Sequence, residues 1–143
     1  MPLNTALILL ALLAQVFLTL IVYIVLVRGR FAAVRSKKLR ASQYVLVEGE
    51  PSEMARMTNN LRNQFELPVL FYAVVLMLVA INRVTMIDVV LAWIFVIGRV
   101  IHHFVHTRTT DVLLRPRVFA IGMVAVSLLA IHALIIVLGE MVL

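Results

Sequence analysis

Four long apolar segments, separated by polar and basic stretches, dominate the hydrophobic pattern of the chain. The first, third and fourth are long enough for helices that cross a bilayer, which need about 20 residues each. None of the four shows the alternating pattern of a membrane strand. The pattern therefore predicts an all-α membrane protein with one four-transmembrane-helix domain over residues 1–143. The segments run from about Leu3 to Val27, from Leu67 to Ile81, from Val84 to about Val105, and from about Val118 to Val142.

The second apolar segment is too short to cross a bilayer by itself. As a helix, Leu67 to Ile81 rises only about 22 Å, whereas the hydrocarbon core of a bilayer is about 30 Å thick. We therefore expect one continuous helix that begins earlier and passes through Asn59, Asn63 and Glu66. This places an acid and two amides at the level of the lipid head groups, where they are costly without partners. The predicted spans are about 3–27, 56–81, 85–106 and 116–141, with a basic loop at about 28–52.

Short-range signals predict where two of these helices begin and one contact inside the bundle. Thr85 is followed three residues later by Asp88, which resembles a capping box at the start of the third span. Pro116 suits the first turn of the fourth span. His132 stands alone on that apolar fourth span, so we expect it to face the bundle and to form a hydrogen bond.

Composition and charge exclude a soluble protein and suggest an orientation. Of the 143 residues, 64% are hydrophobic and 14% charged, and the mean hydropathy is +1.09. A soluble domain of this size does not carry so much apolar surface. Except for Arg83, the lysines and arginines lie near the first-to-second or the third-to-fourth connection. By the positive-inside rule both connections are cytoplasmic and both termini lie on the other side, as expected of a multi-pass protein in a bacterial inner membrane.

Three further features limit the function. The net charge of +6 follows from this topology and has no aromatic-interleaved basic patch beside it, so nucleic-acid binding is not expected. The chain has no cysteine, so any thiol chemistry needs a thiol that arrives with a ligand. The N-terminus has neither a basic region nor a small-residue cleavage site, so the first span is expected to be an uncleaved anchor.

Polar side chains form a stripe on the second and on the third predicted helix. At 100° per residue, the first stripe covers an arc of about 120° and the second an arc of about 100°. Because the second helix starts and the third ends at the cytoplasmic side, we expect the stripes to meet there, beside Arg115 and Arg117. The first stripe is Arg56, Asn59, Arg62, Asn63 and Glu66, and the second is Arg99, His102, His103 and His106.

These stripes allow structural as well as functional interpretations. Glu66 can pair with Arg62, with Arg99 or with an arginine of the fourth helix, and the asparagines of the second helix can link neighbouring helices. His102 and His106 are one turn apart, like two ligands of a metal ion, but no third ligand follows at a recognisable spacing. We therefore predict no metal site.

Two stretches of the sequence resemble the signatures of the MAPEG family, the membrane-associated proteins in eicosanoid and glutathione metabolism. In RMTNNLRNQFELPVLF, Asn63 and Glu66 match the Asn and the Glu that open the second helix of that family. In GRVIHHFVHTRTTDVLLRPRVF, Arg99 and His102 match its GRxxH motif, and Arg115 matches the arginine that starts its fourth helix. The resemblance covers essentially the whole chain, including its length and its four spans.

The resemblance implies a homotrimer of four-helix protomers that binds glutathione between neighbouring subunits at the cytoplasmic membrane surface. Membrane lipids surround such a trimer, and a hydrophobic small molecule is the implied substrate. The implied activity is that of a glutathione-dependent transferase or peroxidase acting on lipophilic electrophiles, with Arg115 near the sulfur as the catalytic residue. The residues implied to bind glutathione are Arg62, Asn63, Glu66, His102 and His106, with Arg35 as a looser match.

The sequence also departs from the catalytic members of that family. Asn59 stands where eicosanoid-forming members carry an arginine, and His106 stands where a tyrosine is frequent. Pro116 and Phe119 replace hydroxyl-bearing residues that follow the arginine. An eicosanoid synthase is therefore not expected, and whether the chain is an enzyme stays open. The alternative functions are a non-catalytic or accessory membrane protein, or a lipid-binding scaffold, that keeps the MAPEG fold.

Overall fold

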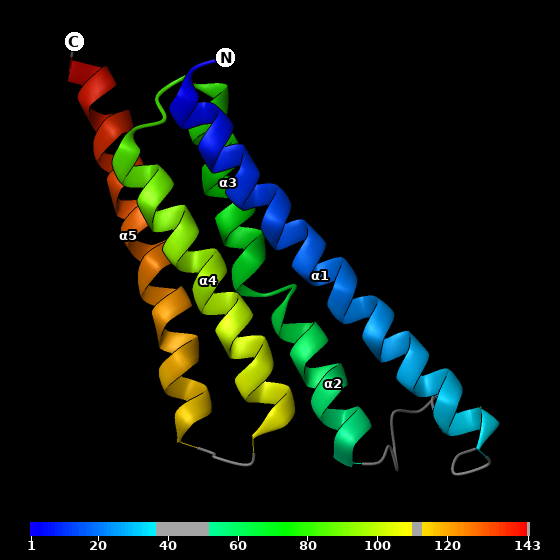
Figure 1. The fold of residues 1–143 in the computed structure, drawn as a ribbon. Coiled ribbons are helices and arrows are strands. Elements are labelled where there is room, and N and C mark those ends of the chain that lie inside the picture. Colours follow the sequence, from blue (N-terminus) through cyan, green and yellow to red (C-terminus); the bar gives the residue numbers. More distant parts are fainter. Residues whose placement is uncertain (37–51, 110–112, 143) are drawn as a thin grey trace.

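The computed structural model of the chain describes residues 1–36, 52–109 and 113–142, and within these residues every regular element is a helix (Figure 1). The helices are α1 (Leu3–Arg35), α2 (Ser52–Asn63), α3 (Leu67–Ala80), α4 (Met86–Arg108) and α5 (Leu114–Val142). By length and composition, α1, α4, α5 and the combined stretch Ala55–Ala80 can each cross a membrane. This confirms the prediction of an all-α membrane protein with four spans.

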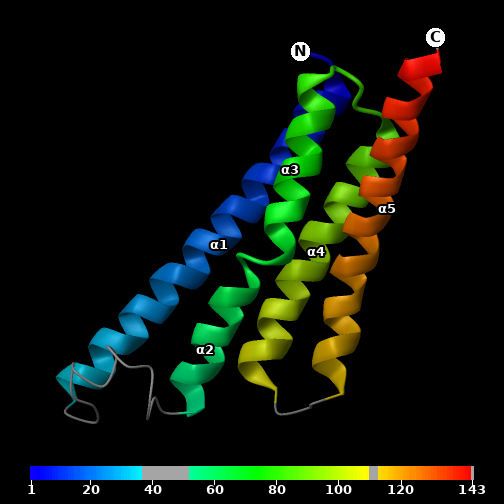
Figure 2. The same ribbon diagram turned by 180° about the vertical axis from the view of Figure 1, so that it is seen from behind.

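Successive spans run in opposite directions, so both termini lie at one end of the bundle (Figure 1 and Figure 2). The other end, at which α1 and α4 finish and α2 and α5 begin, carries most of the described arginines, and we name it the basic end. The central helix is α4, which packs against α1, α2 and α5. Toward the basic end α1 leans away from α4 and α5, and α2 lies between α1 and α4 (Figure 1 and Figure 2).

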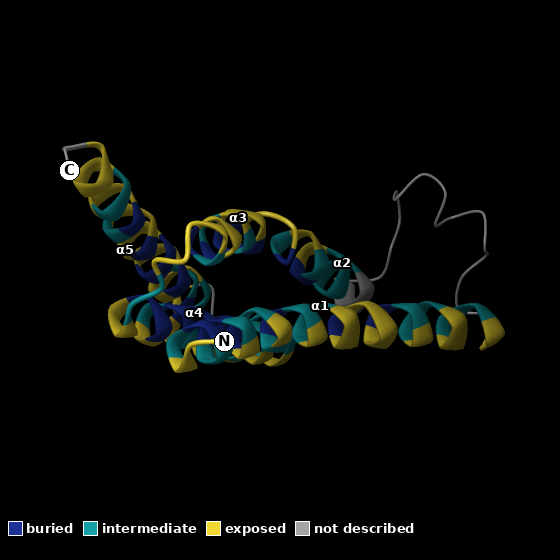
Figure 3. Cartoon of the chain, turned by 90° about the horizontal axis from the view of Figure 1, so that it is seen from above, coloured by how far each residue is buried: buried dark blue, intermediate teal, exposed yellow. Residues whose placement is uncertain are grey.

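An aromatic and aliphatic core fills the bundle. Phe71 of α3 stacks on Phe95 of α4 with ring centroids 4.5 Å apart, and both side chains are fully buried. Seen along the bundle in Figure 3, the buried positions of neighbouring helices face one another, whereas exposed positions cover the outer sides. Those outer sides are rich in leucine, isoleucine and valine. Such a surface suits lipid, whose tails are as apolar as these side chains.

The prediction of one continuous second helix is wrong, because the chain breaks at residues 64–66 between α2 and α3. Pro68 lacks the N–H that would bond to the carbonyl of Gln64, and its ring crowds that turn. Glu66 takes a non-helical conformation with φ −95° and ψ −90°, and Pro68 lies in the first turn of α3, where its N–H is not needed. Since α3 alone rises only about 21 Å, the break brings irregular backbone into the span.

The ends of the other helices differ from the prediction in one place and agree with it in another. The first helix continues to Arg35 instead of ending near Val27, since the sequence between them contains one glycine and no proline. The rest of the predicted basic loop, residues 37–51, lies outside the described residues. The capping box is confirmed: Thr85 is the N-cap of α4, and Asp88 accepts the backbone N–H of Thr85 at 2.8 Å.

Gly98 sets the separation of α4 and α5 where these helices cross. A Cβ at Gly98 would lie 3.3 Å from Cγ2 of Ile121, whereas a Cβ at Gly122 would lie 3.6 Å from Cδ of Arg99, an ordinary contact. We expect Gly98→Ala to lower the free energy of unfolding by about 1 kcal/mol, because the helices must separate slightly. Gly122→Ala is the matched control and is expected to be neutral or slightly stabilising, because alanine favours helix. Unfolding by SDS in mixed micelles measures both, and equal losses would contradict this role of Gly98.

Candidate functional site

Arg99 closes the break in the second span. Its side chain, only 1% exposed, extends from α4, and its Nη2 donates a hydrogen bond of 2.7 Å to the carbonyl of Asn63, the last residue of α2. In an unbroken helix this carbonyl would accept the N–H of Leu67. A cation at the C-terminal end of a helix also interacts favourably with the helix dipole. Arg99 therefore replaces a hydrogen bond that the break removes, and it fixes α2 against α4.

Two asparagines of α2 meet two histidines of α4 near this point. The amide nitrogen of Asn63 lies 3.5 Å from Nε2 of His102, and the amide nitrogen of Asn60 lies 2.7 Å from Nδ1 of His103. The amides donate and the ring nitrogens accept, so a neutral His102 carries its proton on Nδ1. The predicted meeting of the two polar stripes is thus confirmed for Asn63 and His102, whereas His103 is bound by Asn60, which lies outside the predicted stripe.

An aromatic and cationic wall continues the cluster toward α5. The ring centroid of His102 lies 5.5 Å from that of His106 and 5.5 Å from that of Phe119. The guanidinium of Arg99 lies 6.0 Å from the centre of the Phe119 ring. Arg115, in the first turn of α5, donates to a backbone carbonyl just after α4 and is close enough to His106 to interact with it electrostatically. His102 and Arg99 thus contact the Phe119 ring, and His106 and Arg115 extend the cluster beyond His102.

Three of the predicted site residues do not join this cluster within one chain. Arg62 and Glu66 are exposed. Glu66 attracts Arg99 electrostatically but forms an ion pair with no described residue, so none of its predicted pairings is observed there. Arg35 ends α1 where that helix leans away from α4 and α5 (Figure 1 and Figure 2).

Several buried polar atoms of the cluster have no hydrogen-bond partner among the described residues. A buried donor without a partner costs about 1–3 kcal/mol, so such atoms are typical of a place where a ligand or a second subunit supplies the partner. Cationic and N–H donors of this kind suit an anionic or carbonyl-bearing ligand. No group of three or more histidine, aspartate and glutamate side chains in the described ranges could hold a metal ion. The unpartnered atoms are Nε and Nη1 of Arg99, Nδ1 of His102, Nδ1 of His106, Nε of Arg115 and Oδ1 of Asn60.

Arg99 and Phe119 are central to the cluster, yet residue spacing assigns a ligand-binding role to neither. For Arg99 a signal is present, since an arginine in the interior of an apolar helix requires a partner. For Phe119 there is none, because its contact with His102 depends on how α5 packs against α4. The buried hydrogen bond of 3.0 Å from Gln15 of α1 to Gln64, within the break, is likewise visible only in the structure.

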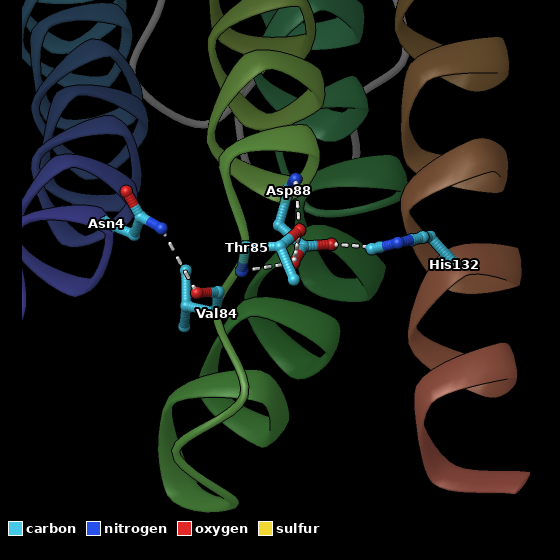
Figure 4. Close-up of polar contacts among 5 residues, drawn as sticks. All are labelled: Asn4, Val84, Thr85, Asp88 and His132. Atoms are coloured by element: carbon cyan, nitrogen blue, oxygen red, sulfur yellow. Dashed lines mark hydrogen bonds and ion pairs between the residues drawn. The ribbon is translucent and has the colours of Figure 1, made fainter. Parts of the chain in front are cut away.

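A second polar cluster lies near the termini, at the opposite end of the bundle (Figure 4). Asp88 is fully buried, and its carboxylate accepts hydrogen bonds from Nδ1 of His132 at 2.7 Å and from the N–H and hydroxyl of Thr85 at 2.8 Å each. The hydrogen bond predicted for His132 is thus confirmed. Asn4 of α1 donates to the carbonyl of Val84 at 3.5 Å. Through these three hydrogen bonds to a buried carboxylate, the cluster ties α4 to α5.

One protein family accounts for nearly the whole chain. No curated protein and no solved structure matches the chain significantly. The sequence model of the MAPEG family matches residues 8–135, and this range contains both signature stretches and every residue of the cluster around Arg99. The chain therefore belongs to the MAPEG family.

Proposed function

We propose that the protein is a membrane-bound, glutathione-dependent transferase or peroxidase that acts on lipophilic electrophiles. The observation that carries the proposal is the convergence of Asn63, Arg99 and His102, with buried donors that lack partners. Members of its family generally bind glutathione. Glutathione would supply the thiol that the chain does not contain, since it has no cysteine.

The proposal gives each predicted residue a role toward glutathione. Asn63 and Glu66 would hold the peptide and the amino group, Arg62 and His102 would line the same site, and Arg115 would lie near the sulfur. Glu66 and Arg62 are exposed in the single chain, beside a break inside the span. An exposed carboxylate at such a level is costly unless a ligand or a neighbouring subunit covers it. This cost supports a site that is completed by glutathione.

Arg115 would act by stabilising the thiolate. A thiol with a pKa of about 8.5 is mostly protonated at neutral pH, and each unit by which that pKa falls needs about 1.4 kcal/mol of preferential thiolate stabilisation. Arginine stays protonated, so its contribution is electrostatic. The thiolate would attack an aryl halide, forming a C–S bond as the halide leaves. With a lipid hydroperoxide, one glutathione would become a sulfenic acid as the alcohol forms, and a second would give the disulfide and water.

We also propose that three copies assemble with these sites between neighbouring subunits, and that the basic end faces the cytoplasm of a bacterial cell. The family is generally trimeric and membrane-embedded, and the positive-inside rule supports the orientation, with both termini on the non-cytoplasmic side. Arg35 lies on the part of α1 that leans away from its own α4. In a trimer it would therefore serve the site of a neighbouring subunit, whereas His106 would serve the site beside its own His102.

Arg115→Ala tests the proposed chemistry. We expect it to lower kcat/KM for the conjugation of glutathione to a chlorodinitrobenzene by about 10- to 100-fold, which corresponds to one or two units of thiol pKa. Arg115→Lys should keep part of the activity, because it keeps the charge. The matched control is Arg117→Ala, two residues further along α5, where an exposed arginine is lost and the activity should not change. The measurement is steady-state turnover in detergent, together with the ultraviolet absorbance of the thiolate when glutathione is added.

Unchanged turnover in Arg115→Ala would favour a second candidate function, a non-catalytic or accessory membrane protein with the same fold. Its support is that Asn63 binds Nη2 of Arg99 and Nε2 of His102, and that Asn60 binds Nδ1 of His103, without any ligand. In that case wild-type protein would turn over neither the aryl halide nor a lipid hydroperoxide, and no thiolate absorbance would develop. That outcome would overturn the glutathione proposal.

A further inference from the structure

An apolar groove opens between α1 and α4, on a side of α4 that the glutathione proposal does not use. It has a volume of about 630 Å³, and sites for small ligands measure about 300–1,000 Å³. His103 lines the groove, whereas the neighbouring His102 faces Phe119 of α5. Consecutive residues of a helix point about 100° apart. The groove and the contacts of Arg99 and His102 therefore lie on two sides of the same helix, and His103, which also binds Asn60, lies at the boundary between them.

The α1 wall of the groove is a continuous apolar stripe that ends in an arginine. Leu18, Ile21 and Val25 line the groove. On a helix of 100° per residue, Arg28 falls within about 80° of arc together with them, one turn beyond Val25. The wall is therefore apolar along most of its length and becomes cationic at the basic end.

The α4 wall shows the same change of polarity. Val100 and Phe104 line its apolar part, and Thr107 and Arg108 line it at the basic end. Arg108 lies 5.3 Å from the centre of the Phe104 ring, and it is exposed. Neither Arg28 nor Arg108 forms a hydrogen bond or an ion pair with any residue of the described ranges. The exposed guanidinium of Arg108 thus lines the mouth of the apolar groove, and the exposed Arg28 lies one helical turn beyond Val25 on the same face of α1.

We propose that this groove binds one anionic phospholipid, with an acyl chain along the apolar stripe and the phosphate between Arg28 and Arg108. Basic pockets between membrane helices are suited to anionic head groups, and a guanidinium can bind a phosphate through two hydrogen bonds. A second copy of the chain fits the mouth less well. A second copy seated at the mouth would have to bring an acidic group toward Arg108 and Arg28, whereas a phospholipid carries its own phosphate at the level of the head groups. The inference does not depend on the glutathione proposal.

Lipid retention by the full-length protein tests the inference. Purified protein is mixed with phosphatidylglycerol or with phosphatidylcholine of the same acyl chains, and bound lipid is counted by native mass spectrometry. We expect wild-type protein to prefer phosphatidylglycerol by about tenfold or more, since each arginine near a head group contributes about 1 kcal/mol. Arg28→Ala with Arg108→Ala should reduce that preference to less than about twofold. Ile21→Trp, which fills the apolar stripe, should lower the retention of both lipids.

Two control variants distinguish lipid binding in the groove from a general effect of positive charge on the protein. Arg83→Ala with Arg117→Ala removes the same number of positive charges outside the groove and should leave the preference unchanged. Arg28→Lys with Arg108→Lys keeps the charge and should keep most of the preference. The inference is overturned if wild-type protein retains both lipids equally or if the double alanine variant keeps the preference. It is also overturned if Phe104→Cys, the only thiol in the chain, forms a disulfide with a second copy in the membrane, because a subunit would then cover the groove.

Discussion

Asp88→Ala is expected to lower the free energy of unfolding by about 3 kcal/mol. The Asp88 carboxylate is fully buried and accepts two hydrogen bonds from Thr85 and one from His132. Its loss removes the carboxylate half of the capping box, worth about 1 kcal/mol, and leaves the half-buried imidazole of His132 without its acceptor, at about 1–3 kcal/mol. Titration with SDS in mixed micelles, followed by circular dichroism, measures the change in unfolding free energy.

An ion pair of the same length at the same end of the bundle provides the control for Asp88. Arg83 and Glu140 lie 2.7 Å apart, but their side chains are 54% and 44% exposed. An exposed pair contributes only about 0–1 kcal/mol, so Glu140→Ala should have a small effect. Asp88→Asn keeps the shape of the side chain, so its loss of unfolding free energy should lie between those of Glu140→Ala and Asp88→Ala. Equal losses for Glu140→Ala and Asp88→Ala would show that burial does not set the strength of these contacts.

The parts of the fold that sequence predicts well are those set by composition or by near neighbours. The number of spans follows from hydropathy, and the cap of α4 follows from Thr85 and Asp88, which are three residues apart. The end of α1 is missed, because basic residues mark the edge of a membrane and say little about where a helix stops. The break before α3 is missed because the length argument assumes an unbroken helix, although Pro68 is a signal against one.

The residues of the candidate site are likewise predicted where a helix face determines them and missed where a tertiary contact does. Asn63 and His102 are found from the faces of their helices, and the structure brings them together. The break invalidates helical angles carried across it, so Glu66 cannot be assigned to the face of Asn59 and Asn63 by adding 100° per residue. The position of Arg99 against the last carbonyl of α2 requires both the break and the packing of α2 on α4. Such a contact is tertiary, and no local pattern encodes it.

Arg99→Met is expected to lower the free energy of unfolding by about 2 kcal/mol and to weaken glutathione binding by about 100-fold or more. Methionine fills similar space but leaves the carbonyl of Asn63 buried without a donor, and a hydrogen bond from a charged group contributes about 1.5–3 kcal/mol. The substitution also removes Nε and Nη1, two buried donors that have no partner among the described residues. Two charge-assisted hydrogen bonds to a ligand would account for a loss of this size. Calorimetry with glutathione and the micelle titration measure the two effects separately.

Two effects of opposite sign act on the free energy of unfolding of Arg99→Met. Removing a buried cation also removes its desolvation penalty, and apolar replacements of buried charges are often neutral or stabilising. For Arg99 we expect the lost hydrogen bond to outweigh the removed desolvation penalty, because the carbonyl of Asn63 stays in place as an unpaired acceptor inside the span. Arg108→Ala, on the same helix but exposed, is the control and should change neither unfolding nor glutathione binding. If Arg99→Met is as stable as wild type and binds glutathione equally well, Arg99 neither closes the break nor takes part in the site.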